Sequence, residues 1–337
     1  MILVTGGAGF IGSALVWGFN EADIEDILLV DRLGTGSKWK NLCKRRYYDF
    51  LHKDELPSFL DAAGSGTQRG PAKKTFEMVF HIGACSSTTE VDADYLVENN
   101  FRYSQMLWQY CADRGIPFVY ASSAATYGSG EAGFSDDPAR LDSLKPINMY
   151  GYSKKMFDSW VLRQSKKPPF WAGLKFFNVY GPNEFHKGAQ ASVPFHLWSQ
   201  INEQGRVKLF KSYREEIAHG EQQRDFIYVK DVVDVMLHLY RSHKKKSCES
   251  GIYNLGTGKA RTWVDLAQAC FVGAEKGKAK IDFIEMPDSL KKQYQYFTEA
   301  DMRRFRQKTG FSQKFTTLED GIADYYSRYL ATDDPHL

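Results

Sequence analysis

Short apolar runs alternate with segments of helical period through the first half of the chain. Such runs are typical of strands that are buried on both faces of a sheet. We expect strands at residues 2–5, 27–30, 78–81, 118–121 and 171–177. Strands that alternate with helices predict right-handed βαβ units. The pattern therefore predicts an α/β fold built on a doubly wound parallel sheet.

The pattern becomes less regular after Phe177, where turns interrupt the apolar runs. This is typical of a smaller mixed α/β domain that covers a cleft. We expect residues 1–178 to form the sheet domain and residues 179–337 a smaller, substrate-binding domain. The two are expected to interleave, because a strand-like run at 226–229 precedes a helix that Asp231 can cap, so that about 224–241 rejoin the first domain.

Composition narrows the class of protein. A length of 337 residues suits two domains, and 43% hydrophobic with 25% charged residues is ordinary for a globular protein. The 44 basic and 41 acidic residues are too balanced to favour nucleic acid as a partner. The 5 cysteines form no C-x-x-C pair, which argues against a zinc site or a disulfide framework. We expect no metal.

The N-terminal segment enters a predicted strand at Ile2, with no basic region or long apolar stretch before it. A signal peptide and a membrane span both need a long apolar segment. We therefore expect a protein of the cytoplasm that does not interact with a membrane.

Three glycines follow the first predicted strand. Gly6, Gly9 and Gly12 form a G-x-x-G-x-x-G arrangement before an apolar helix, and Asp31 ends the second strand about twenty residues later. Glycines at this spacing allow a tight turn and close approach of the backbone to a pyrophosphate at the helix N-terminus. These residues predict a Rossmann dinucleotide site.

Charges near Asp31 bear on the choice of cofactor. Asp31 alone suits the ribose hydroxyl of NAD and repels a 2′-phosphate. Basic side chains can reverse that preference, and three are close in sequence: Arg32, Lys38 and Lys53. Exposed cations are common, so each could also be an ordinary surface residue. We expect NADP in preference to NAD.

Candidate redox chemistry lies at Tyr150 and Lys154. Their spacing of four residues places both on one face of a helix. A tyrosine is a poor base near neutral pH unless nearby positive charge favours its anion, and Lys154 and an oxidised nicotinamide both supply such charge. Ser123 follows the strand at 118–121, at the carboxyl end where such sheets bind ligands. We expect Ser123, Tyr150 and Lys154 to act together on a substrate hydroxyl.

Motifs along nearly the whole chain carry a family resemblance. The segments are TGGAGFIGS (5–13), GACSSTTE (83–90), YASSAATYG (120–128), NMYGYSK (148–154), FFNVYGP (176–182), HKG with ASV and FH (186–196), RDFIYVKDV (224–232) and NLGTG (254–258). The chain resembles the extended short-chain dehydrogenase/reductase superfamily, in its sugar-nucleotide epimerase and dehydratase branch. Segments 83–90 and 186–196 more narrowly resemble the epimerases that act on ADP-heptose.

The resemblance implies that NADP oxidises C6″ of an ADP-linked heptose to a ketone and returns the hydride to the other face. Lys187 matches the second catalytic base of these enzymes, opposite the tyrosine. The resemblance also implies synthesis of lipopolysaccharide core heptose, and a homo-oligomer, expected to be a pentamer.

Further contacts are implied only by this resemblance. Expected cofactor contacts beyond those above are Phe10, Ile11, Ala84, Cys85, Ser86, Asn99 and Val179, with Lys154 and Lys187 shared. Expected substrate contacts are Ser123, Asn178, Ala189, His196, Phe210, Arg224 and Tyr294. The chain departs from the family pattern at Ile82, Ala189 and 211–213, which bears on the sugar and nucleobase contacts.

Four other functions compete with this one, and one of them is a dehydrogenase that catalyses net oxidation. A UDP-sugar 4-epimerase would share every cofactor residue and Tyr150, but the HKG segment argues against it. A 4,6-dehydratase needs acidic groups beside Ser123, where this chain has Ala124 and Ala125. A non-catalytic NADP-binding regulator would keep the fold but has no need of Ser123, Tyr150 and Lys187.

Overall fold

The large sheet has seven parallel strands. The computed structural model describes residues 1–65, 76–291 and 294–337, and within them the strand order is β10-β6-β5-β4-β1-β2-β3. The strands are β1 (Ile2–Thr5), β2 (Ile27–Asp31), β3 (Asp49–His52), β4 (Met78–His81), β5 (Phe118–Ser123), β6 (Trp171–Phe176) and β10 (Gly251–Leu255). The predicted doubly wound α/β fold is confirmed.

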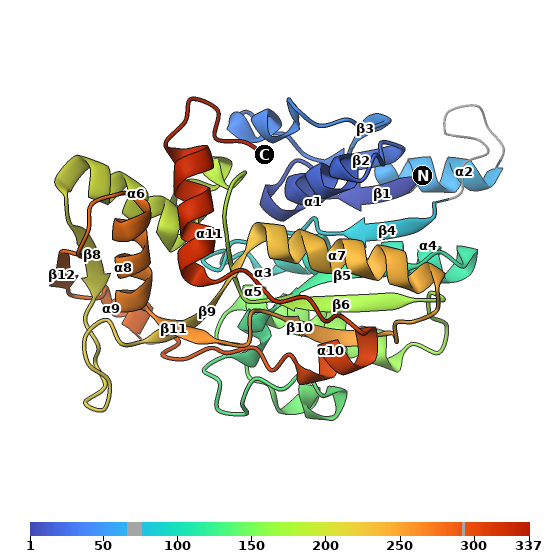
Figure 1. The fold of residues 1–337 in the computed structure, drawn as a ribbon. Coiled ribbons are helices and arrows are strands. Elements are labelled where there is room, and N and C mark those ends of the chain that lie inside the picture. The colour runs from blue at the N-terminus through green and yellow to red at the C-terminus, as the bar shows by residue number, and fades with distance from the viewer. Residues whose placement is uncertain (66–75, 292–293) are drawn as a thin grey trace.

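Helices cover both faces of this sheet. Helices α1 and α7 pack on one face, and α4 and α5 lie on the other (Figure 1). The helices of the described ranges are α1 (Phe10–Glu21), α2 (Leu56–Ser65), α3 (Ala93–Leu96), α4 (Tyr103–Arg114), α5 (Met149–Arg163), α6 (Val193–Gln204), α7 (Val229–Lys244), α8 (Trp263–Gly273), α9 (Asp288–Lys291), α10 (Arg303–Thr309) and α11 (Leu318–Tyr325). None of them is both long and apolar enough to cross a membrane.

Two small sheets lie beside the large one (Figure 1). One is β11 (Ala260–Thr262), β9 (Gln223–Tyr228) and β7 (Asn178–Tyr180), and the other pairs β12 (Ile281–Ile284) with β8 (Val207–Phe210). Helix α11 packs against α8 on this side of the molecule. The smaller mixed sheet region that the irregular second half predicts is thus present, while the domain boundary at 178 stays a prediction.

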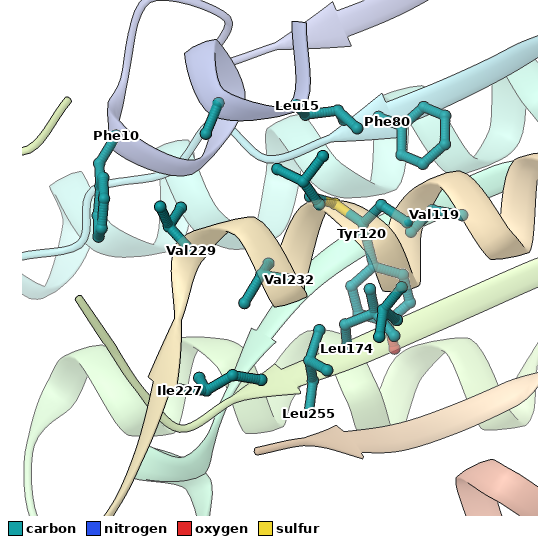
Figure 2. Packing of buried hydrophobic residues seen from close by; sticks show 14 of the residues in the cluster. Phe10, Leu15, Phe80, Val119, Tyr120, Leu174, Ile227, Val229, Val232 and Leu255 are labelled. Atoms are coloured by element: carbon teal, nitrogen blue, oxygen red, sulfur yellow. The ribbon is translucent and has the colours of Figure 1, made fainter. Parts of the chain in front are cut away.

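The core fills the space between the helices and the large sheet. Figure 2 shows Leu15 of α1, Val232 of α7 and Phe80 of β4 in one packed cluster, and all three side chains are fully buried. Apolar side chains from α1, α7 and the sheet remove one another from water, which is the main favourable contribution to folding. The carboxyl ends of β1, β4 and β5 are thereby held side by side.

Some local predictions need correction. The expected strand and helix are present: 226–228 end β9 of a small sheet, and α7, which begins at Val229, packs against α1. Asp231 does not cap that helix, because its carboxylate accepts hydrogen bonds from the backbone N–H and hydroxyl of Thr316, both at 2.9 Å. The Gly, Ser and Lys content of residues 61–74 predicts a surface loop, but residues 61–65 continue α2, and 66–74 lie outside the described residues.

Candidate active site

The glycine turn joins β1 to α1 in the shape that a pyrophosphate requires. Gly6 has a φ of +68°, and a Cβ on it would lie 2.6 Å from the Cα of Gly83. A Cβ on Gly12 would lie 2.0 Å from the carbonyl oxygen of Gly6. Gly9 starts α1 without a side-chain cap, so the first N–H groups of the helix stay available to a ligand. The turn fits a dinucleotide.

A cleft of about 700 Å³ opens from this turn. It is lined by the following predicted site residues: Gly6, Gly9, Phe10, Ile11, Gly12, Asp31, Lys38, Ala84, Ser86, Ser123, Tyr150, Lys154, Asn178, Val179, Lys187 and Ala189. Most come from the carboxyl ends of strands in the large sheet or from the segments that follow them, as expected for this architecture. One cleft therefore brings together the glycine turn and all four predicted catalytic side chains.

A smaller hollow of about 200 Å³ adjoins the cleft and shares Gly6, Asp31, Lys38 and Ala84 with it. It contains the other predicted cofactor residues, which are Arg32, Lys53, Cys85 and Asn99. Its position at the end of β2 is where this kind of sheet places the adenosine half of a dinucleotide.

Asp31 lines both the cleft and the smaller hollow, and charged side chains surround it. Its carboxylate accepts hydrogen bonds from the backbone N–H of Ala8 at 2.9 Å and of Arg32 at 2.6 Å. Lys38 Nζ lies 2.5 Å from the same carboxylate. Lys53 forms an exposed ion pair with Asp54 at 2.8 Å, and Arg32 is exposed at the rim. The acid thus has a basic neighbour, as the preference for NADP requires.

Tyr150 lies in the first turn of α5, whose N-terminus is capped by Asn148 through a 2.8 Å bond to the N–H of Gly151. Burial raises the pKa of the Tyr150 phenol, and a hydrogen bond with Ser123 opposes that increase. Positive charge near the phenol, as an oxidised nicotinamide would supply, would favour the anion.

Lys154 lies one helical turn further along α5 and is buried. Its Nζ donates a 2.8 Å hydrogen bond to the carbonyl oxygen of Ala121 in β5. Burial lowers the pKa of Lys154 to about 8, because desolvation disfavours the charged ammonium. Asp158, the next turn along, opposes this decrease.

Asp158 itself belongs to a buried polar network beneath the site. Its carboxylate accepts hydrogen bonds from Tyr120 at 2.9 Å and Ser122 at 2.8 Å, and pairs with Lys175 at 2.7 Å. Lys175 also donates a 2.7 Å bond to Thr126. The network ties α5 to β5 and β6, and so fixes the catalytic helix against the strand that ends at Ser123.

Lys187 lies in a short 3-10 segment, η5 (Phe185–Gln190), on another side of the cleft. Its ammonium is 5.3 Å from the centre of the Phe10 ring, a cation–π distance. Burial lowers the pKa of Lys187, and the carboxylate of Glu184 opposes the decrease. A lysine with a lowered pKa is suited to accept and donate protons near neutral pH.

Four expected substrate residues do not line the two described cavities: His196, Phe210, Arg224 and Tyr294. Arg224 is buried between two rings, 5.2 Å from the centre of Tyr294 and 5.6 Å from that of Trp263. Trp263 does line the cleft and donates a 2.8 Å bond from its indole nitrogen to the Tyr294 hydroxyl. Arg224 and Tyr294 thus support a wall residue that the sequence did not single out.

Asn100 was also missed by the sequence analysis. Its side chain bonds both backbone groups of Cys85, at 2.8 and 3.0 Å, and donates to Ser153 of α5 at 3.0 Å. It thereby fixes the segment 84–86 against the catalytic helix. Its neighbour Asn99, which was expected to contact cofactor, donates to the carbonyl oxygen of Tyr95 at 2.8 Å. The only feature of the sequence that could have indicated a role for Asn100 is that it directly follows Asn99.

Other residues in or beside the sequence motifs also line the cleft, although no role was predicted for them. His186 lines the cleft beside Lys187, and burial lowers its pKa to about 4, which leaves the imidazole neutral near pH 7. Ile82, one of the departures from the family pattern, lies on the cleft wall. Within the described ranges, no group of three or more His, Cys, Asp or Glu side chains is placed to hold a metal ion.

Comparisons with known proteins agree with this geometry. The model of the NAD-dependent epimerase/dehydratase family matches residues 2–256. Proteins named ADP-L-glycero-D-manno-heptose-6-epimerase from Fusobacterium nucleatum and Nitratidesulfovibrio vulgaris are 50% and 51% identical, each alignment covering 100% of both chains.

Solved structures give the same result. The Helicobacter pylori ADP-L-glycero-D-manno-heptose-6-epimerase superposes with a TM-score of 0.78 at 28% identity, covering 97% of this chain and 95% of that one. A UDP-N-acetylglucosamine 4-epimerase from Methanobrevibacter ruminantium superposes with a TM-score of 0.77 at 22% identity, over 98% of each chain, and shares the fold. The chain belongs to the NAD-dependent epimerase/dehydratase family, in the group of the ADP-L-glycero-D-manno-heptose-6-epimerases.

Proposed function

We propose that this protein interconverts ADP-D-glycero-β-D-manno-heptose and ADP-L-glycero-β-D-manno-heptose, in the synthesis of lipopolysaccharide core heptose. The observation that carries the proposal is that Tyr150 and Lys187, from different elements, line the same cleft as the glycine turn. Oxidation and re-reduction at C6″ each involve a proton transfer at its oxygen, and an inversion can use a separate acid/base group for each of the two orientations. This cleft offers two such groups. The relatives supply the identity of the sugar nucleotide.

The glycine turn at Gly6, Gly9 and Gly12 would hold the pyrophosphate of NADP, which when bound in its oxidised form would supply reversible hydride transfer at C6″ of the heptose. Tyr150 removes the proton of the C6″ hydroxyl in the first step. Ser123, which is hydrogen-bonded to Tyr150, holds the same substrate oxygen. Lys154 is fixed to the backbone of β5 and places positive charge at the base of this pair.

Lys187 completes the inversion. Once the ketone has turned its other face toward the hydride, Lys187 donates a proton to the oxygen as the hydroxyl re-forms. In the reverse direction Lys187 is the base and Tyr150 the acid. Burial lowers the pKa of the Lys187 ammonium, which makes it a stronger acid toward the oxygen on which the hydroxyl re-forms.

We propose NADP as the cofactor in preference to NAD. Arg32, Lys38 and Lys53 surround the hollow beside Asp31, and Lys38 already pairs with the Asp31 carboxylate. A 2′-phosphate there would meet two further cations rather than an isolated acid. Location in the cytoplasm and assembly into a homo-oligomer, expected to be a pentamer, stay predictions that light scattering and fractionation can test.

Substrate contacts remain proposals of the same kind. Asn178 and Ala189 line the cleft and are placed to meet the sugar. Tyr294 and Arg224 lie behind Trp263, so we propose that they act on the nucleotide by holding that wall. His196 and Phe210 do not line the two described cavities, and their contacts with substrate are proposed from the resemblance alone.

Two substitutions test the proposed function. Tyr150→Phe and Lys187→Met should each lower epimerisation at least about 100-fold while NADP stays bound, because each removes one proton-transfer group. The matched control is Lys230→Met, which removes a lysine of α7 that pairs with Asp324 at 2.6 Å and lies outside the cleft. Near wild-type activity of Lys187→Met would remove Lys187 from the mechanism.

A further inference from the structure

One buried carboxylate holds the loop that carries Lys187. Glu184 directly precedes η5 and has 0% of its surface exposed. Its Oε1 accepts hydrogen bonds from the N–H of Gly181 at 3.2 Å, the Ser192 hydroxyl at 2.7 Å and the Tyr325 hydroxyl at 3.1 Å. Its Oε2 accepts from the N–H of Ser192 at 2.5 Å. Four donors thus compensate the desolvation of this carboxylate.

These bonds join the two ends of the Lys187 segment. Glu184 lies before η5 and Ser192 after it, where α6 begins. The segment between them has few internal constraints: Gly188 has a φ of +54°, and backbone bonds run from Lys187 to Glu184 and from Ala191 to Gly188. A short irregular loop of this kind depends on the contacts at its ends to keep one shape.

Tyr325 brings the far end of the chain into this arrangement. It lies at the end of α11, is fully buried, and does not line either described cavity. Its hydroxyl donates a hydrogen bond to the Glu184 carboxylate, which lies 141 residues earlier in the sequence. The hydroxyl therefore acts on the site through Glu184.

The charged groups around Lys187 also point to Glu184. The groups that face the Lys187 segment are Glu184, the neighbouring His186, and Lys38 with Asp31 beyond His186. His186 is uncharged near pH 7, and Lys38 is paired with Asp31. Glu184 is thus the carboxylate that acts directly on the Lys187 ammonium.

We propose that Glu184, held in place by Tyr325, is the positioning residue that presents Lys187 to the cleft. The inference rests on the proposed function, in which Lys187 is the second proton-transfer group. Gln in place of Glu184 keeps the volume but loses the charge and an acceptor. Phe in place of Tyr325 loses one donor and leaves every cleft residue unchanged.

The test compares Glu184→Gln, Tyr325→Phe and Tyr253→Phe in the NADP-loaded enzyme. Tyr253 is the matched control, because it is fully buried and donates a 2.7 Å bond to the carbonyl oxygen of Glu249, on the edge strand β10. We expect kcat to fall about 100-fold in Glu184→Gln and about tenfold in Tyr325→Phe, with KM within about twofold, since small misplacements of a catalytic group are costly. Tyr253→Phe should stay within about twofold of wild type.

A second measurement does not depend on turnover. The pH dependence of Lys187 acetylation by acetic anhydride, followed by mass spectrometry, reports the acidity of its ammonium. We expect the half-maximal pH to fall in Glu184→Gln, because a neighbouring negative charge is lost. It should not change in Tyr253→Phe.

The outcomes separate this inference from the proposed function. Lys187→Met with near wild-type activity overturns the proposed function and the inference with it. If Lys187→Met is inactive, the inference alone is overturned by Glu184→Gln with unshifted acetylation, or by Tyr325→Phe with the same kcat as Tyr253→Phe. If Glu184→Gln does not fold, the comparison of Tyr325→Phe with Tyr253→Phe decides.

Discussion

Acid should destabilise the folded protein through His81, a buried residue at the end of β4. Its ring nitrogens bond the Thr5 hydroxyl at 2.7 Å and the Ser104 hydroxyl at 2.8 Å, and its side chain is only 3% exposed. Burial lowers the pKa of His81 from 6.5 to about 3. The imidazole therefore stays neutral in the folded state at pH values where the unfolded chain binds a proton.

The size of the effect follows from these two pKa values. Because the folded pKa lies below the unfolded one, stability is fully present above pH 6.5 and is lost as the pH falls toward about 3. Between pH 7 and pH 5 the unfolded chain gains most of one proton at this site. The free energy of unfolding should fall by about 2 kcal/mol over that interval through His81 alone.

The assay is urea unfolding at pH 7, 6 and 5 in the wild-type protein and in His81→Gln. Substitution itself costs stability, so the comparison is between the pH slopes rather than the absolute values. The wild type should lose about 2 kcal/mol more than His81→Gln between pH 7 and pH 5. Equal slopes in the two proteins would refute the assignment of this acid sensitivity to His81.

Three further predictions concern the cofactor site and its support. Gly12→Ala should purify without bound NADP, since its Cβ would meet backbone at 2.0 Å, and wild-type nucleotide content would contradict this. Arg32→Ala should weaken the binding of NADP at least about tenfold, as measured by calorimetry, and should change the affinity for NAD by no more than about twofold. Equal losses of affinity for the two nucleotides would argue against a contact between Arg32 and the 2′-phosphate. Lys175→Met should lower the free energy of unfolding by about 3–5 kcal/mol, because it leaves the Asp158 carboxylate buried without its cation. The double variant Asp158→Asn/Lys175→Met should regain part of that free energy. A cost below about 1 kcal/mol would contradict that pairing.

Sequence pattern predicted the centre of the large sheet well and its edges poorly. β1, β2, β4, β5 and β6 are buried on both faces, which produces continuous apolar runs. β3 is an edge strand with half-exposed side chains, so its residues show no such run. β10 is buried, but it is also an edge strand, and Gly251 and Asn254 interrupt its apolar run. Only its last residues appear among the sequence motifs, in the NLGTG segment.

Some residues of the candidate site could be predicted from the sequence and others could not. Residues in the glycine turn and on α5 were predictable because local geometry requires glycine, or a four-residue spacing, at those positions. Glu184, Asn100 and Trp263 were not, because each acts through partners far away in sequence: Tyr325, Cys85 and Tyr294. Arg224 was expected to contact substrate only because of the family resemblance, and in the fold it is buried between two rings.

Inversion of C6″ of an ADP-heptose in one cleft, with a cofactor that stays bound, can be tested directly. The purified protein is incubated with ADP-D-glycero-D-manno-heptose, without added cofactor, and the two epimers are separated by chromatography. We expect a mixture of the D- and L-glycero epimers with no net change in NADP. An unchanged ADP-heptose, together with interconversion of a UDP-hexose at C4, would contradict this expectation.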